Sequence, residues 1–449
     1  MTTGGTPTVA NGENNSGHEY FMGRFLANWT PTDSTNVDVT VIYTDEDQGH
    51  DETVPTGVLD LDTIDTFGVT SVIDPLTGLP GTPSSPGFWP NNQNELAHDL
   101  NESNENEALV AILNIQHQLS DDLVLKSITG VIDADNKRFF DNDLVAAADL
   151  VHRDNHYEGF SWSTELRFEL TKETFEWVLG AMYAQDDQEQ DNRITVGDSA
   201  DAILPVPPNV LLPPPFVFPV GLCLQCNQKN FEVDSFAVFS DITWHTNDRL
   251  DLIVGGRYTH DEVLNEFPFA TALAPDPVTF IPFTNPLRPP VSNERSFDDF
   301  APRFSAVFQF TDDLTGYATI SKGYKAGGTS VGHFGLTPVA IPFDDETIWN
   351  YEAGFKSELF DRRVRFNASA FYAEWSDLQV ENFRFLIPGD LSSNFEETQN
   401  VDDAESYGVE LEALALVTDR ITLSGGIGIL ETEITCGCTA TLTGGYVSQ

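Results

Sequence analysis

Apolar and polar residues alternate one by one through long stretches of the chain, and few folds accommodate this pattern. The clearest stretch covers residues 160–170, where Phe160, Trp162 and Leu166 are separated by serine, glutamate and arginine. Successive side chains of a β-strand point to opposite faces of a sheet, so the alternation predicts strands with one apolar and one polar face. Because helical periodicity is hard to find, the pattern favours an all-β fold.

About 14 such segments follow one another along the chain, and the clear ones are long. Similar alternation occurs at residues 300–310, 349–356, 363–372 and 421–429. Strands of soluble sandwiches usually have about 5–6 residues, whereas strands that cross a bilayer at a tilt need about 9–11. Segments of about 10 residues or more therefore suit a transmembrane barrel.

The connections between these segments alternate between short and long. Short polar turns are expected at residues 31–34, 120–122, 171–173, 246–249, 311–313, 360–362 and 418–420. Long loops are expected at residues 47–106, 137–157, 190–229, 263–296, 327–345 and 382–397. An antiparallel up-and-down β-barrel has this arrangement, with short periplasmic turns at one rim and long extracellular loops at the other.

The apolar face of these strands could meet either lipid or a packed protein core. The opposite face repeatedly carries arginine, glutamate, lysine and asparagine, as the inner wall of a wide barrel does. Aromatic residues near the ends of the segments, among them Trp29, Tyr43 and Tyr258, would form girdles at the membrane surface. We therefore predict that the apolar face contacts outer-membrane lipid.

The charge of the chain excludes one class of partner. The 449 residues carry a formal net charge of 22 − 71 = −49, and residues 25–125 contain no lysine or arginine. Such a chain is repelled by phosphates, so no nucleic-acid partner is expected. The 32 Phe, 11 Tyr and 7 Trp also exclude a disordered acidic chain.

One uncharged stretch, residues 202–228, is long enough for a membrane helix. It contains seven prolines between Pro205 and Pro219, each of which would remove a helical hydrogen bond. This stretch is therefore predicted to be an apolar loop. The first 17 residues have neither the basic nor the apolar region of a secretion signal.

Four hairpin-like segments resemble the barrel of TonB-dependent outer-membrane receptors. They are Ser235–Glu262, Phe300–Gly328, Tyr351–Val380 and Glu405–Leu430, and weaker likeness begins at Phe21. The resemblance implies a 22-stranded barrel around a plug, located in the outer membrane of Gram-negative bacteria. It also implies import of a scarce small-molecule ligand, most often a ferric siderophore and otherwise an oligosaccharide or cobalamin, driven by the TonB complex. No catalysis and no cofactor are expected.

The family pattern is not matched at either end of the chain. We expect residues 1–19 to be a disordered or loop N-terminus, and residues 20–449 to be a receptor-like barrel that is incomplete at both ends, with about 14 of 22 strands. Plug and TonB box are not recognised. Two alternative functions remain open at this point: a passive porin-like channel and a secreted acidic β-sandwich that binds glycans.

Two groups of residues are candidates for a metal. The first places carboxylates around Gly49 and could hold Ca²⁺, although it does not follow the EF-hand spacing; its members are Asp45, Asp47, Asp51 and Glu52. An acidic loop without metal is the alternative reading. The second group is His152 and His156, which we expect to lie in a polar loop and strand where alternation separates them from a common metal partner.

The four cysteines form two close pairs in predicted loops: Cys223, Cys226, Cys436 and Cys438. Disulfides at a cell surface are the favoured interpretation, either within a loop or between loops, and a zinc site is the weaker one. Because a Cys-x-Cys bridge closes a very small ring, pairing between loops is favoured.

Exposed aromatic residues in two apolar loops are the candidates for ligand contact, since exposed apolar patches usually mark binding surfaces. They are Phe216, Phe218, Phe267, Phe269, Phe280 and Phe283. Three basic residues near the loop rim, Arg257, Lys322 and Lys325, could meet an anionic ligand, but ion pairs within the barrel wall are the favoured reading.

Overall fold

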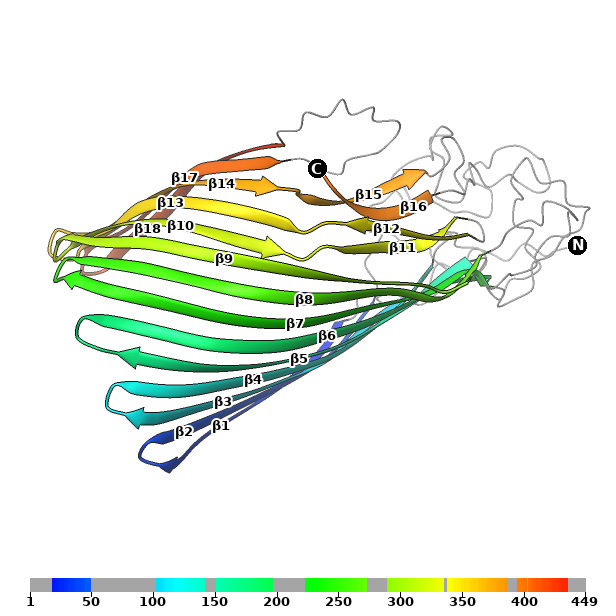
Figure 1. The fold of residues 1–449 in the computed structure, drawn as a ribbon, viewed down its shortest axis with the longest axis horizontal. Coiled ribbons are helices and arrows are strands. Elements are labelled where there is room, and N and C mark those ends of the chain that lie inside the picture. Colours follow the sequence, from blue (N-terminus) through cyan, green and yellow to red (C-terminus); the bar gives the residue numbers. More distant parts are fainter. Residues whose placement is uncertain are drawn as a thin grey trace, which may run out of the picture.

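A computed structural model describes residues 18–49, 102–141, 151–196, 223–272, 289–334, 337–385, 394–401 and 403–434. Nearly all of these residues lie in β-strands (Figure 1). Among them, no helix is long and apolar enough to cross a membrane.

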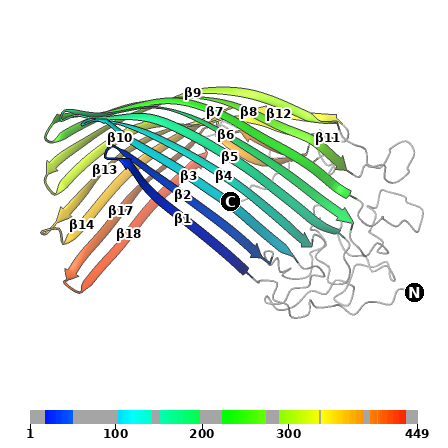
Figure 2. The ribbon, with the colours of Figure 1, turned by 90° about the horizontal axis from the view of Figure 1, so that it is seen from below.

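One antiparallel sheet of 14 strands makes up most of the structure, and its strands follow chain order. They are β1 (His18–Thr32), β2 (Thr35–Gln48), β3 (Ser103–Ser120), β4 (Leu123–Asp141), β5 (Val151–Thr171), β6 (Phe175–Val196), β7 (Cys223–Asn247), β8 (Leu250–Ala272), β9 (Val291–Thr311), β10 (Leu314–Lys325), β13 (Glu346–Leu359), β14 (Val364–Ser376), β17 (Ala404–Thr418) and β18 (Ile421–Ile434). The sheet is strongly curved, and its edges are β1 and β18 (Figure 2). A single continuous sheet excludes the β-sandwich alternative.

The predicted turns are confirmed, and the predicted loops are partly wrong. All seven short turns connect neighbouring strands at one end of the sheet. At the other end the strands extend well into the stretches expected to be loops, so that the loop predicted at 137–157 contains the end of β4 and the start of β5. The strands of the sheet reach 25 residues in β7. Both faces of the strands are polar at this end, so the sequence shows no alternation of apolar and polar residues there, and the strands were not predicted.

The two faces of the sheet have opposite chemistry. One face, the apolar face, presents a continuous band of exposed hydrophobic side chains, which we term the apolar belt. Its members include Phe25, Leu113, Leu166, Val238, Val254, Phe304, Ile320, Tyr351, Val409 and Ile429. The other face, the polar face, carries ion pairs such as Lys126 with Glu169 at 2.8 Å. An exposed belt of this size on a folded sheet is typical of a surface covered by lipid.

Two short hairpins lie at the end of the sheet opposite the tight turns (Figure 1), and the first packs on the polar face of β8 and β9. They are formed by β11 (Gly328–Phe334) with β12 (Thr337–Phe343), and by β15 (Gln379–Phe385) with β16 (Asn394–Asn400). The first hairpin lies inside the loop predicted at 327–345, and the second overlaps the loop predicted at 382–397 and extends beyond it at both ends. Val331 of β11 packs on Phe267 and Val291, which pair with one another in β8 and β9. The small hydrophobic core therefore lies between a hairpin and the wall.

Hydrogen bonds fix the first hairpin to β8 and β9. The backbone N–H of Thr329 donates to Asn265 Oδ1 at 3.0 Å, and the Thr329 hydroxyl donates to Asn293 Oδ1 at 2.8 Å. The Arg295 guanidinium donates to the carbonyls of Gly328 and Phe343. Because the side chains of β8 and β9 make these hydrogen bonds, the hairpin is fixed to the sheet.

The wall has one seam, where β9 and β10 separate. The two strands are paired from Leu314 to Ser321, which lies opposite Arg303. Beyond that point Lys322 of β10 forms an ion pair with Asp299 of β9, and the two side chains are only 19% and 5% exposed. A largely buried ion pair thus joins β9 and β10 where their backbone pairing ends.

The apolar belt predicts a strong difference between two adjacent positions of β8. Val254 is 53% exposed on the apolar face and lies between Ile242 and Phe304. We expect Val254→Arg to destabilise the protein in phospholipid vesicles by about 2–4 kcal/mol, because a guanidinium is costly in the bilayer centre. Ile253→Arg, on the polar face, is the matched control and should cost much less. Equal losses in urea unfolding would contradict the assignment of the faces.

The seam generates a second prediction. Lys322→Met leaves the Asp299 carboxylate buried without its cation, and we expect a loss of about 3 kcal/mol in the free energy of unfolding. Lys325→Met, on the exposed part of the same strand, should have little effect. The double variant Lys322→Met/Asp299→Leu should recover most of the loss, and failure to recover it would show that the ion pair does not hold the seam.

Candidate functional site

A row of carboxylates crosses the sheet at the end opposite the tight turns. Directly paired residues of β2 to β8 form this acidic row: Asp45, Glu107, Asp135, Glu158, Glu189, Asn230 and Glu266. The row lies on the apolar face, beyond the apolar belt. Every member except Asn230 is acidic, so the lipid-facing surface changes to a strongly negative one within a few residues along each strand.

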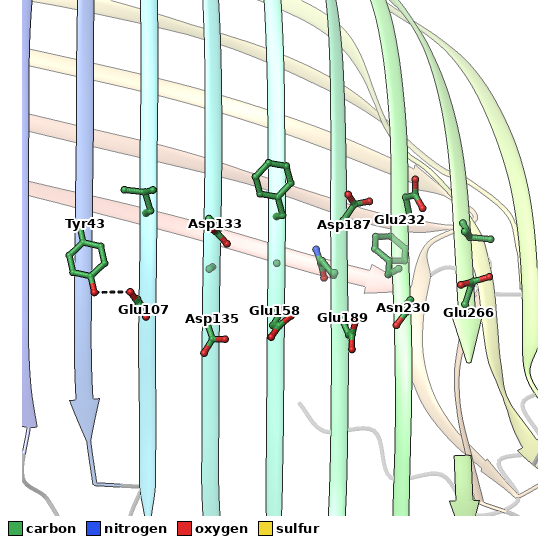
Figure 3. Close-up of a pocket in the computed structure, with 17 residues that line it drawn as sticks. Tyr43, Glu107, Asp133, Asp135, Glu158, Asp187, Glu189, Asn230, Glu232 and Glu266 are labelled. Carbon is green, nitrogen blue, oxygen red and sulfur yellow. Dashed lines mark hydrogen bonds between the residues drawn. The ribbon is translucent and has the colours of Figure 1, made fainter. Parts of the chain in front are cut away.

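All members of the acidic row except Asp45 line a shallow groove of about 760 Å³ (Figure 3). Asp133, Asp187 and Glu232 add three more carboxylates to the lining, and no lysine or arginine is among the described residues that line it. The labelled side chains come from successive strands and lie side by side across the sheet. We term this surface the acidic groove.

Like charges in the acidic groove raise the free energy of the ionised state. Asp187 of β6 lies directly opposite Glu232 of β7, at a spacing where like charges destabilise a sheet. Glu232 lies beyond the apolar belt, and its pKa is raised by burial, by Asp187 and by Asp234. Such a surface attracts cations and repels anions.

Tyrosines mark the boundary between the apolar belt and the acidic groove. The Tyr43 hydroxyl donates to Glu107 at 2.8 Å, and the Tyr258 hydroxyl donates to Asp298 at 2.5 Å. Tyr183 donates to a carboxylate on the neighbouring strand in the same way. Each ring lies on the belt side, and each hydroxyl points to the acidic side. Aromatic rings with one wet end are typical of membrane surfaces.

The polar face carries amides and arginine three residues farther along the strands. Paired residues of β3 to β7 form one row there, which we term the amide ladder: Asn104, Arg138, Asn155, Asn192 and Asn227. Asn155 and Asn192 are buried. The Asn192 amide donates to Asn227 Oδ1 at 3.4 Å, and the Arg153 guanidinium donates to Asn155 Oδ1 at 3.2 Å.

Cationic and aromatic groups extend the amide ladder. The guanidiniums of Arg138 and Arg153 lie 5.8 and 5.7 Å from the centroid of the Phe140 ring. Tyr157 donates to Asn192 Oδ1 at 3.5 Å. The partly exposed side chains of Arg138, Arg153 and Tyr157 offer hydrogen-bond donors and planar surfaces to a ligand in the lumen, and the buried amides of Asn155 and Asn192 accept hydrogen bonds from Arg153 and Tyr157. Sequence reasoning did not identify them, although asparagines at alternate positions, such as Asn104 and Asn106, were a usable signal.

The calcium candidates are only partly described. Asp45 and Asp47 are exposed on β2, opposite Glu107 and Glu105 of β3. The other two, Asp51 and Glu52, lie outside the described residues. The calcium site therefore stays a prediction.

The predicted ligand-contact residues also separate into two groups. Phe267 is described and is buried beneath the β11–β12 hairpin, so it packs in the wall. Phe269 lies in β8, and its side chain is outside the described part. Phe216, Phe218, Phe280 and Phe283 lie outside the described residues, and their role stays a prediction.

Of the predicted disulfide cysteines, Cys226 is buried and disulfide-bonded. Cys223 belongs to β7, but its side chain is not described, and Cys436 and Cys438 lie outside the described residues. The pairing therefore stays a prediction. Of the basic residues, Lys322 is paired in the seam, and the Arg257 guanidinium lies 5.8 Å from the centroid of the Phe239 ring.

A family model described as TonB dependent receptor-like, beta-barrel matches residues 28–446. The pesticin receptor of Yersinia enterocolitica is 29% identical over 184 residues, which cover 40% of this chain and 23% of that receptor. The match between the family model and nearly the whole chain agrees with the strand order and the two-faced sheet.

Two solved structures share the fold. The ferric yersiniabactin uptake receptor FyuA from Yersinia pestis superposes with a TM-score of 0.63 at 17% identity, covering 93% of this chain and 52% of that one. The siderophore receptor PiuA from Acinetobacter baumannii has a TM-score of 0.61 at 14% identity, covering 94% and 58%. The chain thus spans about half the length of these structures.

The acidic groove predicts that Glu232 contributes less to the stability of the folded protein as pH rises, the opposite of a carboxylate held in an ion pair. Because its folded-state pKa is raised, protonation stabilises the folded protein below the unfolded-state pKa, and this contribution is lost as pH rises through the raised pKa. We expect Glu232→Gln to be more stable than the wild type at pH 7 and low salt, by about 0.2–1 kcal/mol.

The stability difference between Glu232→Gln and the wild type should shrink as pH falls through the raised pKa, and it should also shrink in 1 M salt. Urea unfolding in vesicles measures it. Glu169→Gln, which removes the partner of Lys126, is the control and should be destabilising. A destabilised Glu232→Gln at neutral pH would contradict the proposed repulsion.

Proposed function

Since the chain belongs to the β-barrel family of TonB-dependent receptors, which are outer-membrane proteins of Gram-negative bacteria, we propose that it forms the ligand-binding wall of a receptor that imports a scarce metal chelate, in the first place a ferric siderophore. One solved structure described above is titled a ferric yersiniabactin uptake receptor and the other a siderophore receptor. The family consists of transport receptors, so the proposed activity is binding and passage without a chemical reaction.

The observation that carries this proposal is the amide ladder on the lumen side of the wall. A metal chelate is an oxygen-rich, compact ligand, and it is recognised by donors and acceptors fixed on a rigid scaffold. The ladder supplies amides from four strands, together with Arg138, Arg153 and Tyr157. The two guanidiniums would also compensate negative charge on the ligand.

The hairpins support the same placement of the ligand. The β11–β12 hairpin occupies the polar face of β8 and β9, where Arg295 holds it. The amide ladder is carried by β3 to β7, so the ligand would bind beside the hairpins. Energy for release into the periplasm would come from the TonB complex, as in the family.

The test is equilibrium binding of ferric yersiniabactin to the purified chain in detergent, followed by quenching of tryptophan fluorescence. We expect Arg138→Ala and Arg153→Ala each to weaken binding roughly tenfold, equivalent to about 1.4 kcal/mol. Arg193→Ala is the matched control, because Arg193 lies at the same height on the apolar face and is paired with Asp191.

Three outcomes would overturn the proposal. One is a loss of affinity in Arg193→Ala equal to that in Arg138→Ala. Another is binding of cyanocobalamin or a malto-oligosaccharide in place of the ferric chelate, which would assign a different ligand to the wall. The last is ohmic conductance of the chain in planar bilayers with no chelate binding, as expected of a passive porin-like channel.

A further inference from the structure

We propose that Asp135, His156 and Glu158 form a binding site for a divalent transition-metal ion on the outward face of the wall. The three residues belong to β4 and β5, at the edge of the acidic groove. One ligand atom from each lies within 4.8 Å of the others. The site is separate from the lumen, so it does not depend on the proposed import of a chelate.

The distances between the ligand atoms suit one metal ion. His156 Nε2 lies 2.7 Å from Asp135 Oδ2 and 3.3 Å from Glu158 Oε1. Ligands about 2.1 Å from a metal lie about 3.0 Å apart in octahedral and about 3.4 Å apart in tetrahedral geometry. The observed separations lie on either side of the octahedral value and just below the tetrahedral one, so an ion can enter once the side chains move slightly apart.

Strand pairing brings the three residues together. His156 and Glu158 are alternate residues of β5 and therefore share a face. Asp135 of β4 lies directly opposite Glu158, and His156 lies opposite Lys137. The site is thus preorganised by two long strands. The side chains of Asp135 and His156 are each 31% exposed, so an ion can reach them from solvent.

The neighbouring strands add favourable potential and few competing cations. Glu107 of β3 lies opposite Asp135, and Glu189 and Asp191 of β6 lie opposite Glu158 and His156. Two cations compete nearby: Lys137, whose Nζ lies 3.0 Å from Asp135 Oδ1, and Arg193, which lines the same small pocket as His156 and is paired with Asp191. Asp135 Oδ2, on the His156 side, is the other oxygen of that carboxylate. The lysine and the metal can therefore share Asp135.

The ligand set selects a class of ion. Ca²⁺ and Mg²⁺ prefer oxygen ligands alone, whereas one imidazole with two carboxylates suits Zn²⁺ and, more tightly, Cu²⁺. Two carboxylates match the double positive charge. A bound ion would also relieve repulsion in the acidic row, so it should stabilise the folded chain by mass action.

His152 supplies an internal control. It lies four residues from His156 on the same strand, and its Nε2 is hydrogen-bonded to the Thr195 hydroxyl at 2.6 Å. The described cluster does not include it. If the metal bound nonspecifically to any histidine of β5, substitution of His152 and substitution of His156 would weaken binding equally.

The experiment is calorimetric titration of Cu²⁺ and Zn²⁺ into the purified chain in detergent, without reductant. We expect one ion per chain. His156→Ala and Asp135→Asn should each weaken binding at least about tenfold, since even supporting residues of metal sites contribute that much. His152→Ala should bind as the wild type does. Cu²⁺ bound to the wild type should show coupling to one imidazole nitrogen by electron paramagnetic resonance, and this signal should be absent in His156→Ala.

Any of three results would overturn the site. They are no Cu²⁺ or Zn²⁺ binding by the wild type, unchanged affinity in both His156→Ala and Asp135→Asn, and equal competition by Ca²⁺, which would reduce the site to an unselective acidic surface. Heat-modifiable migration of each variant verifies that it is folded. Because the titration contains no chelate, its result is independent of the ferric yersiniabactin experiment.

Discussion

Backbone hydrogen bonding between neighbouring strands is the constraint on which the rest of this structure depends. A bilayer offers no partner to a peptide N–H or C=O, so each strand that crosses it must pair along its whole length. The pairing from β1 to β18 meets this requirement up to the seam, where the backbone pairing of β9 with β10 ends and the Lys322–Asp299 ion pair joins the two strands. Once the pairing is set, the face on which every side chain lies is also set. The apolar belt, the acidic groove and the amide ladder are all consequences of that register.

The strands are much longer than a bilayer requires, and the added length carries the chemistry. Beyond the tyrosine boundary, the outward face becomes acidic while the lumen face becomes rich in amides and arginine. Asp135 and Asn136 illustrate this: adjacent in sequence, one belongs to the acidic row and the other pairs opposite Tyr157 on the lumen side. The same strands thus carry two surfaces of different chemistry, one on each face of the sheet.

Much of the fold could be predicted from the sequence, because the belt strands alternate between apolar and polar residues and the tight turns are polar. Phe160 to Phe168 shows the first signal, and the turn after Thr311 shows the second. The strand ends opposite the tight turns were not predicted, because both of their faces are polar and apolar residues therefore do not alternate with polar ones there. The metal cluster was missed for a different reason. His156 and Glu158 are visible as alternate residues, but their partner Asp135 is 21 residues away from His156 and is brought close only by the register of β4 with β5.

The separation of acidic and amide surfaces on shared strands restricts how this chain can change in length. Side chains alternate with a period of two, so inserting one residue into β4 between the belt and the rim would exchange Asp135 and Asn136 between lumen and exterior. Inserting two residues would keep each side chain on its face and would only lengthen the strand. Length variation among such walls should therefore occur in even steps within strands, and odd steps should be confined to the connections or be absorbed by a bulge, such as the irregularity in pairing between Gln228 and Asn230.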